Sequence, residues 1–291
     1  MPLLAVGIVL FSGLIHASWN LLVRHQRATD MFLQISIVIT GIGLAPALLA
    51  EFIAPPVLPL VWTNVLLGGT FLGIYYFGLT RGYRAGHFTV VYPLARALPV
   101  LLVAFADIAR GHAPTPMGWL GIGLVSTGSF LIPLESLREW HITRYWNRTT
   151  IWILVAAFST ASYSIVDSSA AQVLPTGLTT ALRYNIFESS FALVAYTAIL
   201  LVLAQPIRQI RGQTNWRLAF VATLFVFGGY TLVLWAFQLS PHASYIIGLR
   251  QISIVVGVAA GALFFHEPAA RLRIASAAII TTGVLAISLA G

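Results

Sequence analysis

Length, composition and charge exclude most kinds of protein for this chain. It has 291 residues, of which 58% are hydrophobic and 8% are charged, whereas a soluble domain carries roughly 25% charged residues. The chain must therefore contact lipid over most of its surface, which excludes soluble enzymes, nucleic-acid binders and disordered regulators. The sequence contains no cysteine, which excludes disulfides, thiol redox chemistry and thiolate metal sites.

Apolar segments that could cross a bilayer follow one another along the chain. A transmembrane helix needs about 20 predominantly apolar residues. Ten segments meet this requirement, and we predict helices over 3–23, 31–54, 61–80, 86–106, 115–134, 151–171, 177–204, 216–238, 243–264 and 270–290. The expected fold class is an all-α membrane protein with ten transmembrane helices.

The net charge of +8 comes from sixteen basic residues, all of them arginine, and their positions predict an orientation. The loops after the first, third, fifth, seventh and ninth segments hold Arg24, Arg27, Arg81, Arg84, Arg138, Arg144, Arg148, Arg208, Arg211, Arg217, Arg271 and Arg273. The even-numbered loops and both tails hold only Arg110. Positive loops remain in the cytoplasm, so this pattern predicts a multi-pass protein of the bacterial inner membrane with both termini outside.

The two halves of the chain resemble each other. A first repeat is expected over 1–134, a cytoplasmic linker over 135–150 and a second repeat over 151–291. Phe11-Ser12 aligns with Phe158-Ser159, the stretch from 86 to 100 runs alongside 242–255, and Ser126-Thr127-Gly128 matches Thr281-Thr282-Gly283. Five helices per repeat insert with opposite topology, which predicts an inverted repeat.

These residues carry a family resemblance. The segment His16-Ala17-Ser18-Trp19-Asn20 resembles the first helix of EamA-type members of the drug/metabolite transporter superfamily. Phe264-Phe265-His266-Glu267-Pro268, followed by a glycine-marked helix, is similar to that family's signature. The resemblance implies a ten-helix carrier with a central cavity, in a family that handles amino acids, sugars, nucleotide-sugars and drugs. Arg110-Gly111-His112 stands where that family usually has an acidic residue in the first half.

Polar residues at membrane depth are expensive and therefore indicate function. His16 and Asn20 recur at helical spacing, with Trp19 beside them, and Tyr163 and Asp167 occupy the matching positions of the second half. We expect both stripes to face one substrate cavity. Solvation of Asp167 at the end of its helix is the alternative.

Two arginines lie inside predicted helices and fall within two positions of each other in the aligned halves. Arg96 has Tyr92 one turn before it, and Arg250 is accompanied by Tyr245 and Gln251. Arginine binds carboxylate and phosphate through a planar fork, so we expect an anion site. The alternative is neutralisation by a structural carboxylate.

Two further charged residues lie in one helix, Arg183 and Glu188. A lone buried carboxyl group could hold a proton, or it could be the counter-ion of an arginine. The sequence favours the ion pair.

Aromatic residues complete the expected site. Tyr75 and Tyr76 in the third segment and Tyr230 and Trp235 in the eighth belong to matching segments, so they could cap the cavity from opposite sides. The sequence shows no catalytic motif, metal-ligand cluster or cofactor fingerprint, so we expect no enzyme and no cofactor.

The leading hypothesis is a secondary active transporter that works by alternating access. Its partners would be the lipid bilayer and a small-molecule substrate, most simply an amino acid or a related small organic anion that is exported or exchanged by a monomer. The alternatives are an intramembrane enzyme acting on lipid or lipid-linked substrates, and a channel. The acids are scattered one per helix, which disfavours the enzyme, and a charged ring typical of channels is absent.

Overall fold

A computed structural model describes residues 1–23, 28–85, 88–132, 148–203, 216–264 and 271–290. Within these ranges every regular element is a helix and none is a strand, which confirms the all-α prediction. The helices are α1 (Leu3–Val23), α2 (Ala28–Ile53), α3 (Leu58–Ala85), α4 (Phe88–Ala109), α5 (Pro116–Leu131), α7 (Arg148–Val173), α8 (Leu178–Val202), α9 (Trp216–Leu239), α10 (Ala243–Leu249), α11 (Ile252–Phe264) and α12 (Arg271–Ala290). Most of the linker predicted over 135–150 lies outside the described residues.

Each segment predicted from hydropathy is helical, except that the ninth is divided. Among the described residues, seven stretches are long and apolar enough to cross a membrane, and Leu3–Ser18 is a shorter apolar helix. Large apolar side chains also remain exposed along the bundle, including Leu3, Phe52 and Leu289. Contiguous apolar surface of this kind needs a nonaqueous partner. The chain is therefore a multi-pass membrane protein.

The division of the ninth segment separates α10 from α11 at Arg250 and Gln251. The backbone N–H of Gln251 bonds to the Gly248 oxygen at 3.1 Å, and that of Ile254 bonds to the Gln251 oxygen at 2.8 Å. These bonds span three residues instead of four, which tightens the helix locally. Gly248 packs so closely that a Cβ atom there would lie 2.5 Å from Ile287. The hydropathy average does not detect this break because it involves only two residues.

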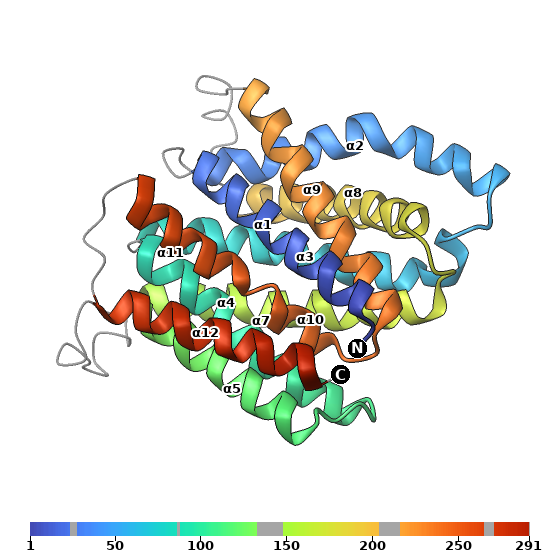
Figure 1. Cartoon of the computed structure of the whole chain (residues 1–291). Helices are drawn as coiled ribbons and strands as arrows, with labels where there is room; N and C mark the ends of the chain where they lie inside the picture. The colour runs from blue at the N-terminus through green and yellow to red at the C-terminus, as the bar shows by residue number, and fades with distance from the viewer. Residues whose placement is uncertain (24–27, 86–87, 133–147, 204–215, 265–270, 291) are drawn as a thin grey trace.

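Packing between helices brings distant parts of the chain together (Figure 1). α5 packs along α12, α3 packs against α7 and α8, and α1 packs against α9. α4 contacts α5, α7 and α10, while α2 contacts α8 and α9. Both chain termini lie at the same end of the bundle. Helices α1–α4 and α7–α10 thus surround the interior, with α5 and α12 at one side.

The connection from α4 to α5 shows how the sequence sets a helix boundary. Gly111 has a φ of +81°, a left-handed conformation that glycine adopts without steric cost. The hydroxyl of Thr115 then accepts a hydrogen bond from the Gly118 N–H at 3.2 Å, and Pro116 follows as the first helical residue. A threonine cap and a proline at the first position both favour helix initiation here.

Candidate functional site

A central cavity of about 80 Å³ lies among the helices. One water molecule needs roughly 10–15 Å³ by this kind of measure, so the cavity has room for several waters or a small solute. Its lining comes from eight helices and the α10–α11 break, and comprises His16, Phe32, Ile39, Leu72, Tyr75, Tyr76, Leu79, Ala95, Arg96, Pro99, Thr160, Tyr163, Asn185, Ser189, Val226, Phe227, Tyr230, Ile247, Arg250 and Gln251. The sequence prediction had placed eight of these residues in the site: His16, Tyr75, Tyr76, Arg96, Tyr163, Tyr230, Arg250 and Gln251.

His16 of α1 joins the two intramembrane arginines. Its Nε2 atom contacts Nη1 of Arg96, and its Nδ1 atom lies 3.2 Å from Nη2 of Arg250. A neutral imidazole has one lone pair, on one ring nitrogen, so it can accept a hydrogen bond from only one guanidinium. At most one of the two guanidinium groups therefore donates to His16.

Gln251 fixes Arg96 in place. The Nε atom of Arg96 donates to Oε1 of Gln251 at 3.1 Å, and Nε2 of Gln251 donates to the Arg96 carbonyl oxygen at 3.1 Å. Gln251 is 2% exposed, so its amide group is buried and both its ends are used. This pairing presents the Arg96 guanidinium to the cavity in one orientation.

Arg250 has few partners for a buried cation. It is 8% exposed, and its guanidinium carbon lies 5.4 Å above the ring of Tyr230. Its Nε atom has no hydrogen-bond partner in the described part of the chain. No aspartate or glutamate is found among the described residues that line the cavity. The cavity therefore has an excess of positive charge, which favours an anionic ligand.

Aromatic rings form the wall beside the arginines. Tyr163 of α7 meets both Tyr75 of α3 and Tyr230 of α9 edge to face, with ring centroids 5.8 Å apart in each pair. Phe32 of α2 stacks on Tyr76 at 4.7 Å. Rings of this kind give an apolar contact surface with hydroxyl groups at their edges. The wall could therefore hold the uncharged part of a small organic molecule.

Asp167 lies behind this wall, outside the cavity lining. It accepts hydrogen bonds from Tyr184 at 2.8 Å and from Tyr230. Its side chain is 0% exposed, so the alternative of solvation at the helix end is wrong. Asp167 contacts the cavity wall through its hydrogen bond with Tyr230.

The ion pair predicted between Arg183 and Glu188 is wrong. Arg183 donates instead to Glu51 of α2 at 3.2 Å and to the Ala50 carbonyl oxygen at 3.2 Å. Five residues along a helix place Glu188 on another side, where it lies beside Asp167. The sequence alone could not show this because the pairing depends on how α8 packs against α2 and α3.

The structure places two other predicted residues away from the cavity. The hydroxyl of Tyr245 accepts from the Thr115 N–H at 2.9 Å, so its side chain points to the end of the bundle that holds the chain termini. Trp235 packs on the hydrophobic core without lining the cavity. The side chains of Trp19, Asn20 and Tyr92 lie outside the part of the chain that the structure describes.

Sequence reasoning missed several lining residues. Asn185 of α8 donates to Thr231 at 2.9 Å and accepts from Ser189 at 3.2 Å, which brings both α8 residues to the cavity. Thr160 and Phe32 also line it. One sequence signal could have indicated the two α8 residues. Asn185 and Ser189 lie one turn apart in the same helix as Glu188.

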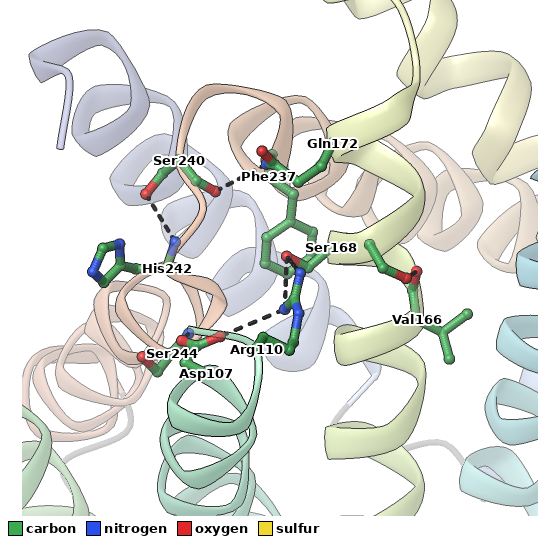
Figure 2. Close-up of polar contacts among 10 residues, drawn as sticks. Asp107, Arg110, Val166, Ser168, Gln172, Phe237, Ser240, His242 and Ser244 are labelled. Carbon is green, nitrogen blue, oxygen red and sulfur yellow. Dashed lines mark hydrogen bonds and ion pairs between the residues drawn. The ribbon is translucent and has the colours of Figure 1, made fainter. Parts of the chain in front are cut away.

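A polar cluster lies at the end of the bundle that holds the termini (Figure 2). Asp107 at the end of α4 accepts a hydrogen bond at 2.8 Å from the Ser244 N–H in the first turn of α10. Arg110 lies 3.5 Å from Asp107 and donates to the Ser168 hydroxyl of α7 at 3.3 Å. This cluster, which we call the terminal-end cluster (Asp107, Arg110, Ser168 and Ser244), ties α4 to both α7 and α10.

Comparisons with known proteins support the fold and nothing finer. No family model matches the chain, and no curated protein matches it. A solved structure described only as "Crystal structure of protein" is 14% identical, and the match covers 98% of this chain and 96% of that chain with a TM-score of 0.68. At this identity the likeness defines the arrangement of helices alone.

Proposed function

We propose that this chain is a secondary transporter of the EamA type that carries small organic anions, amino acids among them, across the bacterial inner membrane. The observation that carries the proposal is the pair Arg96 and Arg250, which line one central cavity. The sequence comparison aligns the segments that hold them. Arginine stays protonated in proteins. An anion in bidentate contact with Arg250 would give its Nε atom, which has no hydrogen-bond partner among the described residues, an acceptor.

Contacts between helices support a ten-span inverted repeat, in which α10 and α11 together form one span. Each helix can be replaced in thought by its counterpart in the other half. The contact of α3 with α7 then becomes that of α9 with α1, and the contact of α3 with α8 becomes that of α9 with α2; all four contacts are present. In the same way, the contact of α4 with α7 corresponds to that of α11 with α1, and the contact of α4 with α5 corresponds to that of α11 with α12. A pattern of this kind is expected when two repeats are related by a two-fold axis in the membrane plane.

Contacts between individual residues of α5 and α12 follow the same exchange. The alignment that matches Gly128 with Gly283 also matches Gly121 with Ser276. A Cβ atom at Gly121 would lie 2.8 Å from the Gly283 carbonyl oxygen, and one at Gly128 would lie 2.8 Å from the Ser276 carbonyl oxygen. Each of these two contacts is therefore the counterpart of the other in the opposite half. Because they involve different atoms from the helix contacts above, they support the duplication independently.

The broken ninth span supports a binding site at the centre. In inverted-repeat carriers, discontinuous helices expose backbone and polar side chains at the membrane midplane. Here the break between α10 and α11 occurs at Arg250 and Gln251, which both line the cavity. The terminal-end cluster holds α4, α7 and α10 together at one end of the bundle, and in the proposed transporter these contacts would break when that end opens.

The test is counterflow in liposomes that contain the purified protein. Vesicles are loaded with one unlabelled compound, and uptake of the same labelled compound is followed for neutral amino acids, dicarboxylic acids and sugar phosphates. A carrier shows transient, saturable accumulation of the labelled compound. Chemical conversion of a lipid without counterflow would instead indicate an intramembrane enzyme, and conductance without saturation would indicate a channel.

A further inference from the structure

Two buried carboxyl groups meet on the side of Tyr230 away from the arginines. Asp167 of α7 and Glu188 of α8 are both 0% exposed. Both face Gly68 of α3, because a Cβ atom on that glycine would lie 2.9 Å from Oε1 of Glu188 and 3.0 Å from Oδ1 of Asp167. The two groups also interact directly with each other. We call them the carboxyl pair.

Within the described ranges, no cation forms an ion pair with either member of the carboxyl pair. Asp167 accepts hydrogen bonds from the hydroxyls of Tyr184 and Tyr230, and both of these donors are neutral. Both carboxyl oxygens of Glu188 are without a hydrogen-bond partner in the described ranges. Arg183, the arginine nearest in sequence, is bound to Glu51.

Two adjacent negative charges cannot persist in such a place. Each buried ion costs several kcal/mol of desolvation, and the repulsion between neighbouring carboxylates in a medium of low dielectric adds to that cost. A proton on one carboxyl group removes one charge and supplies a donor for the other. The unpartnered Glu188 oxygens are thus accounted for by a shared proton.

Tyr230 connects the carboxyl pair to the arginine cavity. Its hydroxyl donates to Asp167, and its ring lies against the guanidinium of Arg250. If the pair loses its proton, the new negative charge lies one side chain away from Arg250 and repels an anion in the cavity. If the pair is protonated, Arg250 keeps its full attraction for the anion. Proton and anion therefore favour each other's binding.

We infer that Asp167 and Glu188 form a proton-binding site that couples the movement of protons to the movement of the anion, so that both cross together. The inference rests on the proposed transport function, and it adds the driving ion and its site. The proton occupies a carboxyl oxygen of the pair and leaves from the same oxygen when the other state of the carrier exposes it.

The first experiment measures the proton directly and does not depend on transport. Infrared spectra of the purified protein should contain the carbonyl stretch of a protonated carboxyl group at neutral pH. Glu188→Gln should remove that band, and Asp167→Asn should remove or shift it. Glu51→Gln is the matched control and should leave it unchanged, because Glu51 is paired with Arg183. Absence of the band from the unaltered protein would overturn the inference.

The second experiment measures coupling in liposomes that contain a trapped pH-sensitive dye. A concentration gradient directed into the liposomes is imposed for each compound that shows counterflow. Entry of the compound should be accompanied by acidification of the liposome interior. Glu188→Gln should keep counterflow but lose both acidification and accumulation driven by a pH gradient. Counterflow without any proton movement in the unaltered protein would overturn the inference while leaving the proposed transport intact. Accumulation of the compound driven by a sodium gradient alone would have the same consequence. Failure of counterflow with every compound would instead contradict the transport function.

Discussion

Arg96 and Gln251 bind each other through two hydrogen bonds, one from the guanidinium Nε to the amide oxygen and one from the amide nitrogen to the Arg96 carbonyl oxygen, each 3.1 Å long. One residue belongs to α4 and the other to the α10–α11 break, which the sequence comparison places in corresponding parts of the two halves. The contact therefore joins the halves at the cavity and orients one of the two cations within it.

Substitution of Gln251 should separate stability from transport. Gln251→Leu leaves the Arg96 Nε and carbonyl oxygen without this partner, which should cost about 1–3 kcal/mol and lower the melting temperature. Gln251→Glu keeps the acceptor for the Arg96 Nε atom but loses the donor to the Arg96 carbonyl oxygen. Its negative charge pairs with Arg96, so it should be more stable than Gln251→Leu while weakening counterflow by competing with the anion. Equal counterflow in Gln251→Glu and the unaltered protein would show that Arg96 does not contribute to anion binding.

The close packing of α5 on α12 predicts that two glycine-to-alanine substitutions in these helices will differ in their effect on stability. Gly283→Ala places a methyl group 2.7 Å from the Gly121 carbonyl oxygen, and such overpacking should cost about 1–3 kcal/mol. Gly123→Ala, also in α5, is the control because a Cβ atom there has nothing within 4 Å. Thermal unfolding in detergent should show a lower melting temperature only for Gly283→Ala. Equal melting temperatures would mean that the two helices pack less closely than described.

Opening of the terminal-end cluster should change access to the cavity. The natural chain has no cysteine, so Ser189→Cys introduces a single reporter thiol in the cavity lining. A membrane-impermeant maleimide added from the side of the termini should react slowly, and adding Arg110→Ala should speed the reaction because the bond to Ser168 is lost. Arg81→Ala is the control, since Arg81 contacts Phe77 and Trp152 instead. An unchanged rate with Arg110→Ala would show that this cluster does not control access.

Orientation in the membrane follows from the arginine loops and has a direct readout. An alkaline phosphatase fused to the C-terminus should be active because the enzyme folds only outside the cytoplasm, and a fluorescent protein fused at the same place should be dark. The reverse result would place the termini in the cytoplasm and contradict the positive-inside assignment.

The sequence was sufficient for those features that depend on local composition. Apolar runs predicted the helices, and the cost of a charge in lipid predicted that Arg96 and Arg250 face the interior. Other features depend on how helices pack, which no local pattern encodes. The break at Arg250 accompanies close contact of Gly248 with α12, and Tyr245 points away from the cavity although it lies close to Arg250 in sequence. The meeting of Asp167 with Glu188 likewise depends on the register of α7 and α8 against α3, where both carboxyl groups face Gly68.

Ligand-dependent melting temperature tests the anion site at Arg250 most directly. A ligand that binds only the native state raises the melting temperature by mass action, so the purified protein is screened with amino acids, dicarboxylic acids and sugar phosphates. Compounds that stabilise it should carry a carboxylate or phosphate group, and esters in which that group is neutralised should have no effect. Arg250→Lys should reduce the shift because it keeps the charge but loses the planar fork, and Arg250→Ala should abolish it while remaining folded. An equal shift with the neutral esters, or an undiminished shift in Arg250→Ala, would contradict an anion site at Arg250.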